Sequence, residues 1–279
     1  MGGDIIGDIS YFSSTTDGCP PCVIPYSIQT TQRSNLEHEC VRMTIHDLRN
    51  KEKSVNLDTN AFEVLKYDGV IQEEFEKDSD AQHTYYKEIS EILKQRLNAS
   101  KVIVYNYAFR SRGLLQADEK HDDNHREPAL YPHVDIASSA VQGLVKILLN
   151  TEEADKAIQN RIQIMNVWRP LGSNVITQQP LTICDYSSVN ADKDVHEYTV
   201  RGAKLHSAGL LMSRDAQDIH KWYYLSQMRS DEMFVFKMAD MKSDVARFAC
   251  HTAFINEQEA IPNVQQTSLE VRCLILYDE

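Results

Sequence analysis

Residues 232–278, EMFVFKMADMKSDVARFACHTAFINEQEAIPNVQQTSLEVRCLILYD, decide the fold class. They predict three strands, at 232–240, 246–255 and 268–278, separated by polar segments. Strands dominate the whole second half, and no alternation of strands with helices appears in it. This pattern favours an antiparallel sandwich or barrel with helices packed outside over a doubly wound sheet. The other strands predicted in this half cover residues 161–171, 180–189, 194–200 and 221–228.

The first half supplies the flanking elements. Residues 1–35 are rich in Gly, Pro, Ser and Thr and predict an extended N-terminal arm with turns. Apolar residues at helical spacing predict a helix over 78–99 and a second one, with a polar break, over 139–159. Residues 101–110, KVIVYNYAFR, predict a strand between them. We expect one domain over residues 1–279, mainly β with flanking helices.

Composition limits the function. The net charge of −12 argues against nucleic acid as a partner, because phosphate binding needs clustered Lys and Arg. No apolar run reaches the roughly 20 residues that span a bilayer, and the N-terminus lacks the pattern of a secretory signal. The six cysteines are expected to be free thiols in an intracellular chain. We therefore expect a cytoplasmic protein that binds a small molecule and does not associate with a membrane.

The stretch LYPHVDIASSAV (130–141) points to a metal site. His133 and Asp135 are one residue apart, so strand alternation places the imidazole and the carboxylate on one side. Two histidines and one carboxylate on one face of a metal form the facial triad of non-heme Fe(II) oxygenases. Such a site needs a second histidine from elsewhere in the chain. The alternative is a surface His–Asp pair without a metal.

Four later histidines could supply the third ligand. His251, in ARFACHTAF, has the best environment because its apolar neighbours would bury an imidazole that needs a partner. His196 lies in a polar stretch, and His206 and His220 flank a predicted loop. The alternative for His251 is a core histidine whose polar atoms are satisfied by the protein.

Several stretches resemble a known family. The sequence is similar to the fungal hydroxylase/desaturase family that includes AsaB-type proteins, CmcJ-type cephamycin methoxylases and gibberellin desaturase-like proteins. The resemblance runs from about residue 10 to the end, and NVWRPL, HKWYY and HTAF are its most specific parts. In chain order it is carried by ISYFSSTTDGCPP, VYNYAFR, PHVDIASSAV, NVWRPL, QQPLTICDYSSV, HKWYYLSQMRSDEMFVFK, ARFACHTAF and SLEVRCLILYD.

The resemblance implies a double-stranded β-helix, a jelly roll of the cupin kind, with His133, Asp135 and His251 as iron ligands. It also implies Fe(II), 2-oxoglutarate and O2 as cofactors. The expected reaction is hydroxylation, desaturation or oxidative cyclisation of a small secondary metabolite through a ferryl intermediate. A cupin-like metal-binding protein or isomerase without oxygen chemistry remains the alternative. The oligomeric state is left open.

A 2-oxoglutarate site also needs a basic partner for the distal carboxylate, and a buried Arg suits it. Arg272 is a charge inside an apolar last strand, where this fold often places that Arg. Arg169, in NVWRPL, and Arg247, which precedes His251 by an even number of residues, are the other candidates. Substrate contacts are predicted from position alone. They are the loop 111–130 and the residues Tyr107, Arg110, Trp222 and Tyr223.

Overall fold

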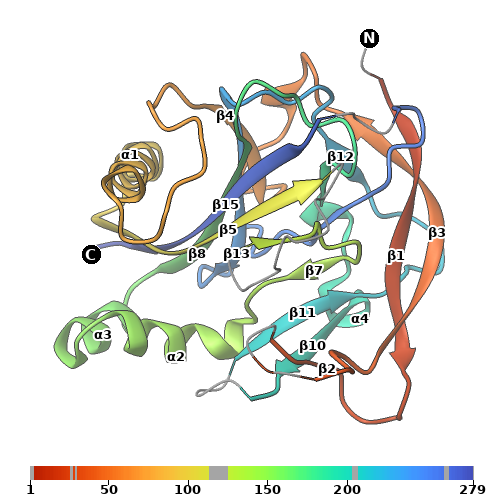
Figure 1. Cartoon of the computed structure of the whole chain (residues 1–279). Helices are drawn as coiled ribbons and strands as arrows, with labels where there is room; N and C mark the ends of the chain where they lie inside the picture. The colour runs from red at the N-terminus through yellow and green to blue at the C-terminus, as the bar shows by residue number, and fades with distance from the viewer. Residues whose placement is uncertain are drawn as a thin grey trace.

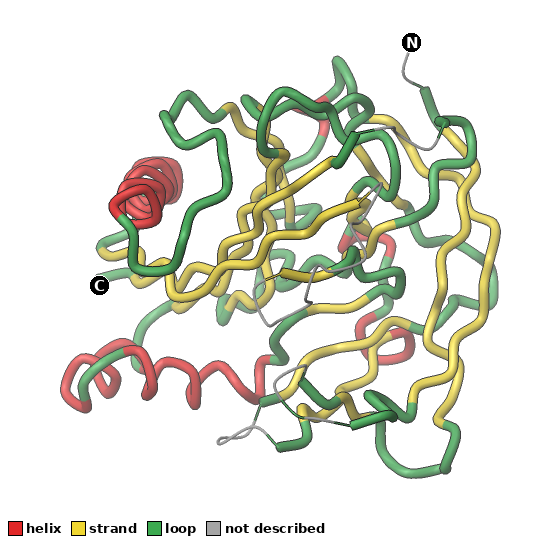
Figure 2. Tube along the Cα trace, in the orientation of Figure 1, coloured by secondary structure: helices red, strands yellow, loops and turns green. Residues whose placement is uncertain are grey.

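Two β-sheets face each other in the computed structural model, which describes residues 3–25, 28, 30–112, 125–202, 207–260 and 264–278. Within these residues the larger sheet has nine strands in the order β1-β3-β12-β9-β14-β7-β11-β10-β2, and the smaller has six in the order β4-β13-β8-β15-β5-β6. Helices lie at the periphery (Figures 1 and 2). The strands are β1 (Ile5–Thr15), β2 (Cys22–Val23), β3 (Leu36–Asp47), β4 (Phe62–Lys66), β5 (Lys101–Arg112), β6 (His125–Arg126), β7 (His133–Val134), β8 (Ile162–Pro170), β9 (Leu181–Cys184), β10 (Val195–Val200), β11 (Ala208–Met212), β12 (Trp222–Tyr224), β13 (Glu232–Asp240), β14 (His251–Ala253) and β15 (Gln266–Leu276). The helices are α1 (Asp80–Leu97), α2 (Ser138–Leu148), α3 (Thr151–Ile158), α4 (Ala191–Asp194) and two 3-10 turns, Glu52–Ser54 and Tyr186–Ser188.

The larger sheet curls so far that β1, at one edge, reaches the end of β11, near the opposite edge. β1 and β3 form a long antiparallel pair along one side of the molecule (Figure 1). Phe12 of β1 then bridges to Ser213, directly after β11. Ile9, Tyr11 and Trp222 of this sheet are fully buried in the core that it shares with the smaller sheet. Much of the segment predicted as an extended arm is therefore a strand within this sheet.

The smaller sheet lies between the larger sheet and α1, and both of its faces are buried. The alternation of side chains in β13 shows this arrangement. Phe234 and Phe236 belong to the core shared with the larger sheet, whereas Met233 and Val235 belong to the core beneath α1. A strand that is covered on both faces is apolar throughout, and this explains the run MFVF in the sequence.

Helix α1 covers the outer face of the smaller sheet (Figure 1). Ser79 caps its start by accepting a hydrogen bond from the backbone N–H of Gln82, and Asn98 ends it in the left-handed conformation. Tyr85, Ile89 and Leu93 recur every four residues and are fully buried against the sheet. Burial of each such apolar side chain contributes about 1.5–3 kcal/mol. The helices α2 and α3 correspond to the predicted helix with a polar break.

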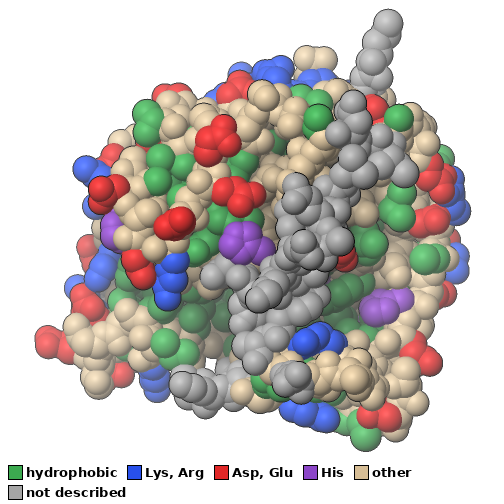
Figure 3. Space-filling model, in the orientation of Figure 1, with side chains coloured by type: hydrophobic (Ala, Val, Ile, Leu, Met, Phe, Trp, Pro, Cys, Tyr) green, Lys and Arg blue, Asp and Glu red, His purple; other side chains and the backbone are tan. Residues whose placement is uncertain are grey.

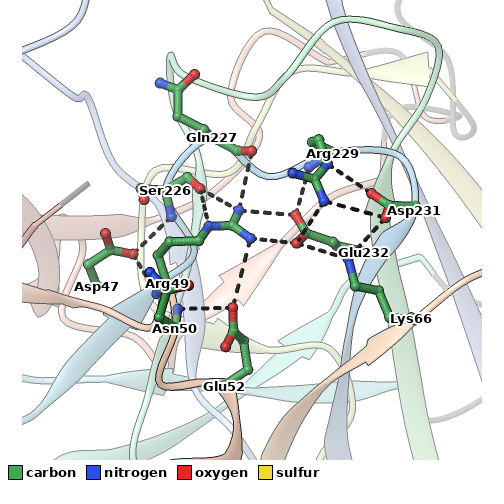
Figure 4. Close-up of polar contacts among 10 residues, drawn as sticks. All are labelled: Asp47, Arg49, Asn50, Glu52, Lys66, Ser226, Gln227, Arg229, Asp231 and Glu232. Carbon is green, nitrogen blue, oxygen red and sulfur yellow. Dashed lines mark hydrogen bonds and ion pairs between the residues drawn. The ribbon is translucent and has the colours of Figure 1, made fainter. Parts of the chain in front are cut away.

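A buried carboxylate ties the two sheets together at one end. Glu232, at the start of β13, is 2% exposed and makes a bidentate ion pair with Arg49, which follows β3, at 2.5 and 3.0 Å. Lys66 of β4 and the backbone N–H of Arg229 complete its partners (Figure 4). Arg49 also donates to the carbonyl of Ser226. Burial raises the pKa of Glu232, but the bonds from Arg49 and Arg229 outweigh it and leave the pKa lowered.

The predicted mainly β architecture with flanking helices is confirmed. The described part of the chain contains no helix that is long and apolar enough to cross a membrane. Acidic and basic side chains are interspersed over the described part of the face in Figure 3.

Candidate metal centre and adjoining pocket

Two histidines meet across neighbouring strands of the larger sheet. His133 of β7 and His251 of β14 are paired directly opposite each other in an antiparallel ladder, so their side chains leave the same face of the sheet. Their ring centroids are 4.4 Å apart, and Phe236 of the facing sheet packs on the ring of His251 at 4.9 Å. Both histidines are buried, with exposed fractions of 5% and 2%. Residues that are 118 positions apart in the sequence thus form one site between the sheets.

Backbone carbonyls fix the orientation of both rings. Nδ1 of His133 donates to the carbonyl of Tyr131 at 2.9 Å, and Nδ1 of His251 donates to the carbonyl of Ala249 at 3.2 Å. A carbonyl can only accept, so each Nε2 carries the free lone pair. Burial lowers the pKa of His133 to about 4, with a further contribution from His251, and burial likewise lowers the pKa of His251 to about 4. Both imidazoles are therefore neutral at pH 7, which is the form that binds metals.

Asp135 completes the group from the end of β7. Its Oδ1 lies 3.6 Å from Nε2 of His133. Its Oδ2 accepts hydrogen bonds from Nδ2 of Asn166 at 2.7 Å and from Nε of Arg272 at 3.0 Å. Burial raises the pKa of Asp135, but Arg272 and the two histidines outweigh burial and hold it well below its usual value. The carboxylate is therefore ionised at neutral pH.

The three side chains fit a metal ion. One ligand atom from each of His133, Asp135 and His251 can be chosen so that all three lie within 4.8 Å of one another. Nε2 of His251 is buried and has no hydrogen-bond partner. A buried polar atom without a partner is costly, and coordination would satisfy it. Two neutral imidazoles and one carboxylate are the donor set expected for non-heme Fe(II).

A pocket adjoins the two histidines. Arg110 and Arg112 of β5, Trp168 of β8 and Glu270 of β15 line its other walls. Arg112 is 4% exposed, and its closest polar contacts are neutral. Both of its Nη atoms lie 3.3 Å from Oγ of Ser268. Burial, and secondarily Arg110, lower the pKa of Arg112 to about 9.

The guanidinium of Arg112 has no carboxylate partner among the described residues, and its Nε has no hydrogen-bond partner at all. Burying an unpaired cation costs several kcal/mol unless an anion offsets it. The pocket beside the candidate metal ligands therefore suits an anionic ligand.

The sequence matches a family described as "Oxidoreductase/YMDC permease-like domain" over residues 9–276, which is nearly the whole chain. The chain belongs to this family. Among curated relatives, "Hydroxylase/desaturase efuI" of Hormonema carpetanum is 25% identical over 97% of this chain and 94% of its own length. "Alpha-ketoglutarate-dependent dioxygenase tstK" of Talaromyces stipitatus is 28% identical over 96% of both chains. The resemblance to fungal hydroxylase/desaturase proteins predicted from the sequence is confirmed.

A solved structure confirms the fold. The "iron and alpha-ketoglutarate-dependent endoperoxidase NvfI" superposes with a TM-score of 0.79 over 99% of both chains, at 22% identity. At this identity the likeness concerns the fold alone. It confirms the predicted double-stranded β-helix for this member of the oxidoreductase family.

The predicted arginines lie in three different environments. Arg272 reaches the centre, but its three nitrogens bind Asp135, Asn106 and Glu270 rather than facing an open pocket. Arg169 is fully buried on the opposite face of β8 from Trp168 and stacks on Tyr67 at 3.9 Å. Because adjacent strand residues point to opposite faces, Arg169 belongs to the core beneath α1.

Arg247, the third predicted arginine, is exposed and donates to the hydroxyl of Tyr186 at 3.3 Å. These placements do not support the predicted 2-oxoglutarate role for any of the three. Arg272 is held by its ion pair with Asp135. Strand alternation turns Arg169 to the other face of β8, and Arg247 lies on the surface.

The predicted substrate residues lie in different parts of the structure. Arg110 lines the pocket. Tyr107 points to the opposite face of β5 and packs on Phe75 and Phe109. Trp222 is fully buried in the curl of the larger sheet, where its Nε1 donates to the hydroxyl of Tyr11 at 2.8 Å. Only Arg110 among these three is in a position to meet a ligand in the described pocket.

Tyr223 is partly buried and packs on Phe62 and His46. Most of the predicted substrate loop lies outside the described residues, and so does His206. The remaining two histidines have partners of their own, since His196 binds Ser213 and His220 binds Asp194.

Sequence reasoning missed Arg112, Asn166 and Glu270. A usable signal existed for Arg112, because alternation along β5 places it on the same face as Arg110. Asn166 and Glu270 follow the same rule, since they alternate with the apolar residues Val167 and Val271 that face α1. Glu270 contacts Arg272 two residues later on the same strand, whereas the contact of Asn166 with Asp135 depends on how the two sheets pack, which no local pattern specifies.

Proposed function

We propose that this protein is an Fe(II)/2-oxoglutarate-dependent dioxygenase that oxidises a small molecule of secondary metabolism. The cluster of His133, Asp135 and His251, with the buried and unpartnered Nε2 of His251, carries the proposal. The enzyme class and the cofactors predicted from the sequence are confirmed by relatives named as alpha-ketoglutarate-dependent dioxygenases and hydroxylase/desaturases. The outcome on the substrate is hydroxylation, desaturation or oxidative ring closure.

The protein's own part in this chemistry is to bind and orient. His133 and His251 present neutral Nε2 atoms because their Nδ1 atoms are held by backbone carbonyls. Asp135 adds a negative oxygen. Fe(II) with 2-oxoglutarate and O2 supplies the oxidant that removes hydrogen from an unactivated C–H bond. Trp168 and Leu181 form apolar walls of the pocket and exclude water from it.

The distal carboxylate of 2-oxoglutarate would bind Arg112. Its guanidinium is buried, lines the pocket beside both histidines and has no anionic partner among the described residues. An Arg presents two parallel N–H donors that match a carboxylate. Ser268 Oγ, between the two Nη atoms, adds a hydroxyl at the same place. Arg272 is set aside for this role because Asp135 and Glu270 already neutralise it.

We further propose that residues 1–279 act as one oxygenase domain in the cytoplasm. The described part of the chain supports the single domain, because its two sheets share one core that extends from β1 to β15.

Turnover of 2-oxoglutarate without substrate tests the function. The purified protein with Fe(II), 2-oxoglutarate and O2 should form succinate slowly. His133→Ala and His251→Ala should bind less Fe(II) and form none, while near-UV circular dichroism stays unchanged. Fe(II) binding without succinate formation in the wild type would favour the cupin-like alternative. Product mass with candidate substrates then separates hydroxylation, which adds one oxygen, from desaturation or ring closure, which removes two hydrogens.

A further inference from the structure

A carboxylate can bind a metal through one oxygen or through both, and the neighbours of Asp135 bear on that choice. Its Oδ2 already accepts two hydrogen bonds, from Asn166 at 2.7 Å and from Arg272 at 3.0 Å. Its Oδ1 has neither of these donors and lies 3.6 Å from Nε2 of His133. The two oxygens of one carboxylate therefore differ in their surroundings.

Arg272 is itself held in place. Its Nη1 donates to Oδ1 of Asn106 at 2.6 Å, and its Nη2 donates to Glu270 at 2.9 Å. The guanidinium is planar, so fixing Nη1 and Nη2 also fixes the direction in which Nε donates. Asn166 approaches the same oxygen from β8, whereas Arg272 approaches it from the neighbouring strand β15. Two elements of the smaller sheet thus fix a residue of the larger sheet.

We propose that Arg272 and Asn166 are positioning residues that hold Oδ2 of Asp135, so that the metal receives Oδ1 alone. This inference rests on the proposed function. Two Nε2 atoms and one carboxylate oxygen leave three of six coordination positions, whereas a chelating carboxylate would leave two. 2-Oxoglutarate, if it bound through two atoms, would occupy two of these positions. Holding Oδ2 therefore keeps a third position for O2.

Metal binding in the absence of 2-oxoglutarate and O2 tests this role. Apo protein is titrated with Co(II), whose visible absorption reports coordination number and geometry. Arg272→Gln removes one donor and a charge, whereas Asn166→Leu removes one donor without changing charge. We expect each variant to bind Co(II) about 10- to 100-fold more weakly, as is usual when the partners of metal ligands are removed. We also expect the absorption of the Co(II) complex to change.

Two results would overturn the proposal. If Arg272 acted only through its charge, Arg272→Gln would bind Co(II) more tightly and Asn166→Leu would bind it normally. If both residues were merely structural, both variants would melt at lower temperature yet keep the affinity and spectrum of the wild type. Asn166→Leu carries the test alone if Arg272→Gln does not fold, because Oδ1 of Asn166 has no hydrogen-bond partner to lose.

Arg247→Gln is the control, since Arg247 is exposed, donates to the hydroxyl of Tyr186 and lies outside the pocket. It should bind Co(II) with wild-type affinity and an unchanged spectrum. Wild-type protein that fails to bind Co(II) would overturn the proposed function itself. That result is distinguishable from a failure of the positioning role, in which the wild type binds Co(II) and the variants match it.

Discussion

Replacing Arg112 with Gln tests the most specific consequence of the pocket. Gln keeps hydrogen-bonding groups near Ser268 but removes the charge. A buried, charge-assisted bidentate contact of this kind is worth about 2–5 kcal/mol. Since about 1.4 kcal/mol corresponds to tenfold in affinity, the dissociation constant for 2-oxoglutarate should rise roughly 30-fold or more.

The same substitution should not lower the stability of the ligand-free protein. Burial lowers the pKa of Arg112 to about 9, so the folded state disfavours this charge when no anion is bound. Removing the charge relieves that cost. Ligand-free Arg112→Gln should therefore melt at or above the temperature of the wild type. Added 2-oxoglutarate should raise the melting temperature of the metal-loaded wild type strongly and that of the variant little.

Anaerobic calorimetry of the Co(II)-loaded protein measures the affinity without turnover. Arg112→Gln, Arg272→Gln and Arg169→Gln are titrated side by side with 2-oxoglutarate. An unchanged dissociation constant for Arg112→Gln would refute the assignment. If Arg169→Gln lost affinity for 2-oxoglutarate while it remained folded, Arg169 would be the residue that binds the distal carboxylate.

Three further predictions concern stability. Arg169→Gln should lower the free energy of unfolding by about 3–5 kcal/mol in urea titrations, because Arg169 donates to the carbonyls of Ile71, Pro170 and Ser230 and these would lose their partner; a loss below about 1 kcal/mol would contradict this. Ile89→Ala, in the buried stripe of α1, should cost about 2–5 kcal/mol, whereas the exposed Glu91→Ala should be nearly neutral. The lowered pKa of Glu232 means that its contribution is present above the unfolded value of about 4.3 and is lost as pH falls through the lower folded value. Glu232→Gln should therefore be less stable than the wild type at pH 7, and the difference should shrink below about pH 4; equal differences at both pH values would exclude this ion pair as the cause.

The order and type of most elements could be predicted because apolar residues recur with a clear strand or helix periodicity. β13, with both faces covered, contains the continuous apolar run MFVF, and the stripe of α1 recurs every four residues. The course of the N-terminus could not be predicted in the same way. Its pairing with β3 and its bridge to Ser213 join residues far apart in sequence. Local composition therefore suggests an extended arm where the tertiary structure forms a strand.

The cluster of His133, Asp135 and His251 could be predicted because each member carries a local signal. His133 and Asp135 share a strand face, and His251 lies in an apolar strand that offers an imidazole few polar partners. The arginines did not follow from local sequence, because the tertiary surroundings of Arg112, Arg169 and Arg272 differ. Carbonyls and aromatic rings satisfy Arg169, and carboxylates satisfy Arg272. Arg112 has a carbonyl, a hydroxyl and the ring of Trp168 near it, but no carboxylate among the described residues.

The alternation of side chains along a strand would have narrowed the choice of arginine for the 2-oxoglutarate site. Residues of β8 alternate, so Trp168 and Arg169 cannot both face the metal centre, and Asn106, Arg110 and Arg112 of β5 share one face. Alternation shows which face a side chain points to, but not which residues of other strands it will contact there. Arg272 and Arg112 both point into the space between the sheets. Arg272 lies within 3.0 Å of Glu270, two residues earlier on β15, and of Asp135 from the larger sheet, whereas Arg112 lies beside Ser268. A buried arginine marks an anion site only when the fold has not already provided the anion, and that condition separates these two residues.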